Sequence, residues 1–141
     1  DCVFENNTSL SGGALSLING RIERCSFVGN SVPAGSSGGA IQCAAPFAST
    51  GNLVAIDSEF RGNQAGSSGG ALNVASATTV LDGCRFLQNT SQNGGAVNFQ
   101  SSSSTAIELS AFNCLFAGNV ASTGGALFFG GTSFPYSTVR V

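Results

Sequence analysis

Five stretches that read Gly-Gly-Ala followed by an aliphatic residue decide how this sequence folds, and the first is Gly12-Gly13-Ala14-Leu15. A second pattern, Phe-x-x-Asn, stands eight to eleven residues before each copy, beginning with Phe4 and Asn7. Two linked patterns repeated in constant order, with a period of roughly 20–50 residues, are typical of stacked-repeat architectures. The later copies are Gly38–Ile41, Gly69–Leu72, Gly94–Val97 and Gly124–Leu127 for the first pattern, and Phe27/Asn30, Phe60/Asn63, Phe86/Asn89 and Phe116/Asn119 for the second.

The composition fits one domain, and we expect residues 1–141 to form a single segment of a longer repeat protein. Eleven Phe and the regularly placed aliphatic residues supply the core material that a disordered chain lacks. The net charge is −2 and no basic stripe is present, which argues against nucleic-acid binding. No run of about 20 predominantly apolar residues occurs, so we expect no direct membrane span in this segment.

Residues after each Gly-Gly-Ala alternate between apolar and other side chains. Leu15 and Leu17 would face one side and Ser16 the other, a period of two that indicates a half-buried β-strand. The same positions in later copies place Ile41/Cys43, Leu72/Val74, Val97/Phe99 and Leu127/Phe129 inward, and Gln42, Asn73, Asn98 and Phe128 outward.

A second strand is expected before each Phe-x-x-Asn. Counting back two residues from each Phe gives a small residue, usually Cys, so Cys-x-Phe predicts a column of small and large inward side chains. Ile56 and Phe112 would extend this column upstream. The segments Ile22–Cys25 and Leu81–Cys84 carry one extra residue, which indicates a bulge or a corner.

Strands this short cannot bury a face alone, so each copy must stack on the next at about 4.8 Å, the spacing of paired strands. The sequence therefore predicts an all-β protein, a right-handed parallel β-helix (solenoid) of about five coils. In this fold the repeated Asn forms a structural ladder at a turn, where the left-handed backbone that Asn tolerates would suit a sharp corner. The ladder residues are Asn7, Asn30, Asn63, Asn89 and Asn119.

The two patterns together resemble the repeats of the chlamydial polymorphic outer-membrane proteins, and are similar to β-helix repeats in pectin-lyase-like surface proteins of other microbes. The resemblance covers all five copies, and therefore nearly the whole chain. It implies a surface-displayed, autotransported segment that works in adhesion. The implied location is extracellular or at the cell surface, either on the outer membrane or secreted.

Candidate chemistry is sparse. Glycoside hydrolysis uses two carboxyl groups about 5–9.5 Å apart, and Asp57 and Glu59 are the closest pair, expected on one strand face. Arg24 and Arg85 fall in the same columns of neighbouring coils, which favours a surface ladder of salt bridges over a catalytic site. No His and no Cys-x-x-Cys pair is present to hold zinc. We therefore expect no catalytic residues, no metal and no cofactor.

The cysteines leave two alternatives open. Cys2 with Cys25, and Cys84 with Cys114, fall in one column of adjacent coils, close enough for candidate disulfides. Stacking keeps their Cβ atoms slightly beyond the preferred separation, which favours free buried thiols. Three residues match the glycosylation pattern Asn-x-Ser/Thr, namely Asn6, Asn7 and Asn89. Because Asn7 and Asn89 are ladder residues, Asn6 is the better acceptor.

Two functions from different classes follow. The first is a non-enzymatic extracellular β-helix segment that serves adhesion or builds a surface filament or scaffold. Its partner would be a protein or glycan on another surface, or neighbouring copies that stack end to end on exposed strand edges. The alternative is a polysaccharide-binding or polysaccharide-degrading β-helix, which a groove lined by carboxylates would support.

Overall fold

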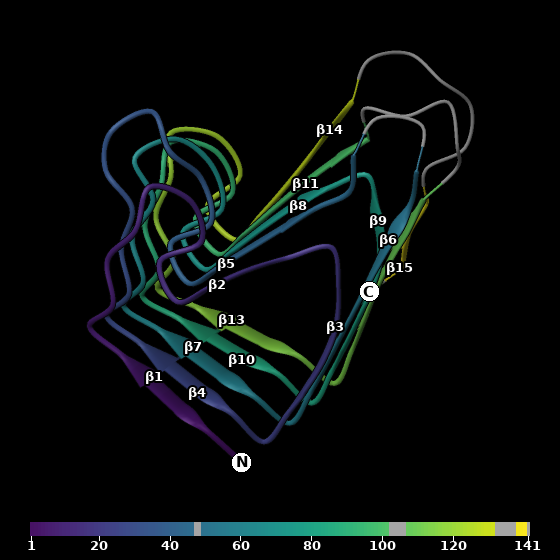
Figure 1. Ribbon diagram of the computed structural model, residues 1–141, viewed down its shortest axis with the longest axis horizontal. Coiled ribbons are helices and arrows are strands. Elements are labelled where there is room, and N and C mark those ends of the chain that lie inside the picture. Colours follow the sequence, from purple (N-terminus) through teal and green to yellow (C-terminus); the bar gives the residue numbers. More distant parts are fainter. Residues whose placement is uncertain (47–48, 102–106, 132–137, 141) are drawn as a thin grey trace.

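The computed structural model describes residues 1–46, 49–101, 107–131 and 138–140. Within these residues the chain forms three parallel five-stranded sheets and no helix. The sheets lie along the three sides of a triangular solenoid, and each coil contributes one strand to each sheet (Figure 1). The prediction of an all-β parallel β-helix of about five coils is therefore confirmed.

The three sheets have the following strands. The first sheet contains β1 (Val3–Glu5), β4 (Ser26–Val28), β7 (Glu59–Arg61), β10 (Arg85–Leu87) and β13 (Leu115–Ala117). The second contains β2 (Leu15–Leu17), β5 (Ile41–Ala44), β8 (Leu72–Ala75), β11 (Val97–Ser101) and β14 (Leu127–Gly131). The third contains β3 (Asn19–Glu23), β6 (Gly51–Ile56), β9 (Ala77–Asp82), β12 (Glu108–Phe112) and β15 (Thr138–Arg140).

The repeated apolar residues occupy the interior in register. Each Phe of the Phe-x-x-Asn pattern pairs with the next one along the first sheet, as Phe27 does with Phe60. The rings of this pair lie 4.9 Å apart and are tilted by only 6°, because the strand spacing sets the stacking distance. Phe27, Phe60 and Phe86 are fully buried. The second sheet adds Ile41, Leu72 and Val97 to the same core, as predicted.

The Gly-Gly pair lies just before each strand of the second sheet, and its two glycines have different structural roles. Gly69, the first of its pair, has a left-handed backbone with φ of 65°. Gly70, the second, lies so close to the coil above that a Cβ would stand 2.1 Å from the carbonyl oxygen of Gly95. The first glycine therefore makes the turn, and the second allows the coils to approach.

The prediction of two strands per coil is wrong, because a corner separates what looked like one strand. Arg24, Asp57, Gly83 and Asn113 stand between third-sheet and first-sheet strands, and all four have φ between 46° and 63°. A left-handed residue turns the chain and changes which side chains point inward. Ile56 and Phe112 therefore face away from the core, and Phe112 is 48% exposed. The inward residues of these strands are Ile22, Ala55, Leu81 and Ala111.

Candidate functional site

The five ladder asparagines form a continuous column of hydrogen bonds. In its middle, Nδ2 of Asn63 donates to Oδ1 of Asn89 at 3.0 Å and to the carbonyl oxygen of Phe27 at 3.0 Å. Oδ1 of Asn63 accepts from both the backbone N–H and Nδ2 of Asn30, each at 3.0 Å. The same side-chain bond joins Asn7 to Asn30 and Asn89 to Asn119. This column satisfies buried backbone groups at the turn, which is a structural duty.

The prediction that the ladder asparagines have a left-handed backbone is wrong, because the left-handed residue lies one position earlier. The residue before each asparagine has the positive φ instead, such as Gly62 with φ of 62° and Gln88 with φ of 56°. The ladder residues themselves are not among the positive-φ residues, and their amides donate to the adjacent coils. The complete column of left-handed residues is Asn6, Gly29, Gly62, Gln88 and Gly118.

A second column of hydrogen-bonded amides runs along the second sheet. Asn73 and Asn98 were expected on the outer face of the second sheet, but they are 7% and 0% exposed. Nδ2 of Asn73 donates to Oε1 of Gln42 at 2.9 Å, and Nδ2 of Asn98 donates to Oδ1 of Asn73. Oδ1 of Asn98 has no hydrogen-bond partner among the described residues, since the next position in the column is Phe128. The amide side chains at these three equivalent positions are the sequence feature that could have indicated a buried column.

The expected carboxylate pair does not come together. Asp57 is the corner residue after β6 and Glu59 begins β7, so they are not two positions on one strand face. Glu59 binds Arg61 at 3.1 Å and Arg85 of the next coil at 3.8 Å. Arg24 binds Asp1 and Glu23 rather than Asp57. Hydrogen bonding to Arg21, together with the charge of Arg24, lowers the pKa of Glu23 below its ordinary value.

The candidate cysteines stack in the column that the sequence indicated. Cys2 precedes β1 and Cys25 precedes β4, while Cys84 and Cys114 precede β10 and β13. Ser58 holds the same position in the middle coil and separates the two pairs. All five cysteines, including Cys43, are free thiols in the structure.

The glycosylation candidates differ in access. Asn6 is exposed at the first turn, whereas Asn89 is fully buried and its amide nitrogen donates to both Phe60 and Asn119. Asn7 is exposed, but its amide nitrogen donates to Asn30 at 2.8 Å. A glycan on Asn89 would break the ladder, so Asn6 remains the better candidate acceptor.

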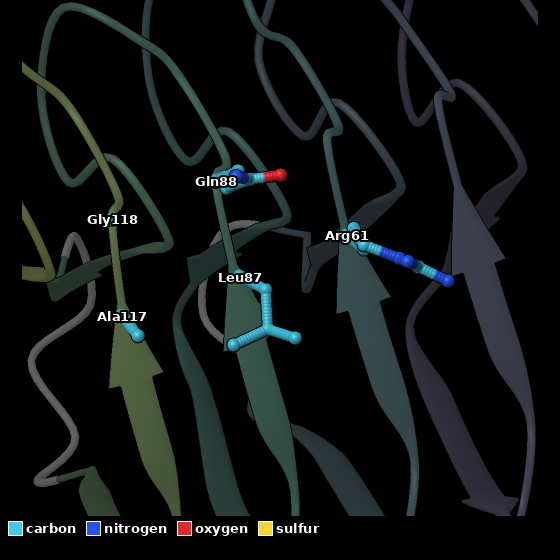
Figure 2. A pocket seen from close by; sticks show the side chains of 5 residues that line it. All are labelled: Arg61, Leu87, Gln88, Ala117 and Gly118. Carbon is cyan, nitrogen blue, oxygen red and sulfur yellow. The ribbon is translucent and has the colours of Figure 1, made fainter.

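The outer face of the first sheet carries the candidate interaction surface. We call it the first-sheet face; its residues alternate with the buried Phe column. An open groove of about 310 Å³ lies on this face, lined by Arg61, Leu87, Gln88, Ala117 and Gly118. Figure 2 shows Arg61, Leu87 and Ala117 on three neighbouring strands, with Gln88 and Gly118 just beyond the ends of β10 and β13. The first-sheet face is made of Val3, Glu5, Ser26, Val28, Glu59, Arg61, Arg85, Leu87, Leu115 and Ala117.

The groove has the chemistry of a binding surface. Its lining offers a guanidinium group, one amide and small or apolar side chains, and none of the lining residues is acidic. Among the described residues, no group of three or more His, Cys, Asp or Glu stands close enough to hold a metal. The same residues include no helix long and apolar enough to cross a membrane.

Comparison with known proteins adds one finding. The model of the Chlamydia polymorphic membrane protein repeat matches residues 1–17, 24–44 and 57–75. Over these three segments the chain is similar to the Chlamydia polymorphic membrane protein repeat. Each matched segment joins a Phe-x-x-Asn turn of the polymorphic membrane protein repeat to a Gly-Gly-Ala strand entry, and the last two coils have the same register. Neither curated proteins nor solved structures gave a match.

The buried cysteine of the second sheet gives a simple test of the core of this repeat protein. Cys43 is fully buried, and this burial raises the pKa of its thiol to about 11. Because the thiolate is the reactive form, we expect iodoacetamide to leave Cys43 unmodified in the native protein at pH 8 and to modify exposed Cys2. Peptide mass mapping after timed labelling checks this. Equal labelling of both residues without denaturant would contradict the packing described here.

Proposed function

We propose that this chain is a non-enzymatic segment of a cell-surface β-helix and that its first-sheet face binds a protein or glycan on another surface. The polymorphic membrane protein repeats and the solenoid fold are consistent with a surface location. The groove at Arg61, Leu87 and Gln88 is the observation that carries the binding role.

The arrangement of repeated and varied residues supports this proposal. Residues that recur from coil to coil point inward or into the turns and build the stack, as Phe60 and Asn63 do. The outward residues of the first sheet change at each coil, from Glu59 to Arg85 to Leu115. A rigid core with a varied flat face suits recognition of a partner.

The first-sheet face also has the mixed character of a protein-binding surface. Arg85 and Arg61 both bind Glu59, so this group of three side chains has one net positive charge. Apolar side chains stand beside it, and Leu115 is 47% exposed. Arginine together with apolar contact area is enriched where protein surfaces meet.

Adhesion of coated particles tests this function. Fluorescent beads that carry the chain are expected to attach to cultured epithelial cells, and the double variant Leu87→Glu/Ala117→Glu to lose at least about tenfold of that attachment, since two carboxylates would fill the groove and oppose burial. Val80→Glu, on the third sheet, is the control for an added carboxylate, because its side chain is half-buried and outward like that of Leu87. Equal attachment by all three proteins would overturn the assignment of the first-sheet face.

A further inference from the structure

Two cysteines stack directly on one another at the corner that leads into the first sheet. Cys84 and Cys114 immediately precede Arg85 and Leu115, which pair in register between β10 and β13. The backbone N–H of Leu115 donates to the carbonyl oxygen of Cys84 at 2.9 Å. In-register neighbours of parallel strands have Cα atoms about 4.8 Å apart, which lies within the disulfide range of about 4.4–6.8 Å.

The two thiols differ in access. Cys84 is fully buried, whereas Cys114 is half-exposed. Sγ of Cys114 lies 3.1 Å from the carbonyl oxygen of Phe112, and Sγ of Cys84 lies 3.4 Å from that of Ala55. A reagent from solvent can therefore reach Sγ of Cys114, whereas Sγ of Cys84 is buried.

From this geometry we propose that Cys84 and Cys114 form a redox-active dithiol that is oxidised reversibly by low-molecular-weight disulfides. Cys114 is the attacking thiol and Cys84 the resolving thiol. The product disulfide would join β10 to β13, the two strands whose far ends line the groove. This proposal stands independently of the adhesive function.

The electrostatics agree with this division of roles. A hydrogen bond from the Cys84 thiol lowers the pKa of Cys114 to about 7, although burial and the charge of Asp82 oppose that shift. The same hydrogen bond and burial raise the pKa of Cys84. The accessible sulfur is thus the one that carries the thiolate, which is the form that attacks disulfides.

The reaction balances with oxidised glutathione as the co-reactant. The thiolate of Cys114 attacks one sulfur of the glutathione disulfide, a mixed disulfide forms, and glutathione thiolate leaves. Cys84 then attacks Sγ of Cys114, so the Cys84–Cys114 bond forms and the bond between Cys114 and glutathione breaks. The thiol proton of Cys84 goes to this second glutathione thiolate as it leaves. The protein loses two electrons and the glutathione disulfide gains them.

Controls are built into the chain. Ser58 holds the equivalent position one coil below Cys84, and its hydroxyl donates to the carbonyl oxygen of Ile56 at 2.7 Å. A serine is therefore accommodated in this column, and Cys84→Ser and Cys114→Ser are conservative variants. Cys43 has no cysteine beside it in its sheet, where its neighbours are Leu17 and Val74.

The test is peptide mapping of the native protein after incubation in glutathione buffers of graded redox ratio, followed by acid quenching and alkylation. Trypsin cleaves after arginine, which places Cys84 in the peptide 62–85 and Cys114 in the peptide 86–140. We expect these two peptides to become disulfide-linked and to separate again with dithiothreitol. Cys84→Ser is expected to hold a glutathione adduct on Cys114, formed at least about tenfold faster than any adduct on Cys43.

In Cys114→Ser we expect no native adduct on Cys84. Absence of the linked peptides from wild-type protein at every ratio would overturn the proposal, as would a glutathione adduct that persists on wild-type Cys114. Faster modification of Cys84 than of Cys114 would reverse the two roles. Should Cys84→Ser fail to fold, the linked peptides of the wild-type protein still decide the question.

Discussion

Replacing Gly70 by alanine is expected to destabilise the solenoid by about 3 kcal/mol, a large fraction of the roughly 5–15 kcal/mol that stabilises a native protein. The new Cβ would stand 2.1 Å from the carbonyl oxygen of Gly95 and 2.6 Å from the backbone nitrogen of Thr90. These atoms belong to the backbone of the next coil, so no side-chain rotation relieves the contact. Urea unfolding monitored by circular dichroism measures the loss.

Gly62→Ala is the matched control for this steric argument. Gly62 has a left-handed φ of 62°, but a Cβ there would meet no heavy atom within 4 Å. The change should cost only the conformational penalty of a left-handed alanine, about 1 kcal/mol. If both variants lose the same stability, close approach of the coils is not what Gly70 provides.

Asn63→Ala should have a comparably large effect, a loss of about 3–5 kcal/mol in the free energy of unfolding. The substitution leaves two donors of Asn30 and the carbonyl oxygen of Phe27 without partners. Asn63 and Asn30 are fully buried, and each unsatisfied buried group costs about 1–3 kcal/mol. Denaturant unfolding of the variant and the wild-type protein gives the difference.

The same substitution at the end of the ladder separates hydrogen bonding from general tolerance. Asn7 is exposed, and its amide nitrogen donates to Asn30, whose Oδ1 also accepts from the backbone N–H of Asn7. Asn7→Ala should therefore cost about 1 kcal/mol or less. A loss at Asn7 as large as that at Asn63 would contradict the idea that burial makes the ladder costly to break.

Most of the fold could be predicted because its interior repeats. Each inward Phe and each ladder Asn contacts the equivalent residue of the next coil, as the Gly-Gly pairs do. The repeat period of the sequence therefore predicts which residues are in contact. The same period carries the similarity to the polymorphic membrane protein repeat.

Only two of the four corners, in Ile22–Cys25 and Leu81–Cys84, could be predicted, because different residues take the same left-handed conformation at the corners. Arg24, Asp57, Gly83 and Asn113 share no side-chain type, yet their backbones match. Asp57, Gly83 and Asn113 are types that tolerate a left-handed backbone, but Arg24 takes the same conformation without that preference. One unrecognised turn then moved Ile56 and Phe112 onto the wrong side of the strand.

The candidate site was less predictable than the fold for a related reason. The groove is lined by residues that belong to no repeated pattern, such as Arg61 and Gln88. Asn73 and Asn98 do follow a column, but the alternation of the strand predicts outward side chains and says nothing of their burial. The repeats therefore predict the interior residues that hold the coils together, but not the surface residues that differ from coil to coil.

The ladder of asparagines has a consequence for how such a protein can change over generations. Each of these amide bonds runs to an immediately adjacent coil, as Asn63 is bonded to Phe27 and Asn30 on one side and to Asn89 on the other. A whole coil can therefore be duplicated or lost by recombination between repeats while every remaining junction keeps the same chemistry. Each such event would shift the displayed residues along the axis by about 4.8 Å. Lineages could then renew their outer appearance by adding or deleting modules, without redesigning a single interior contact.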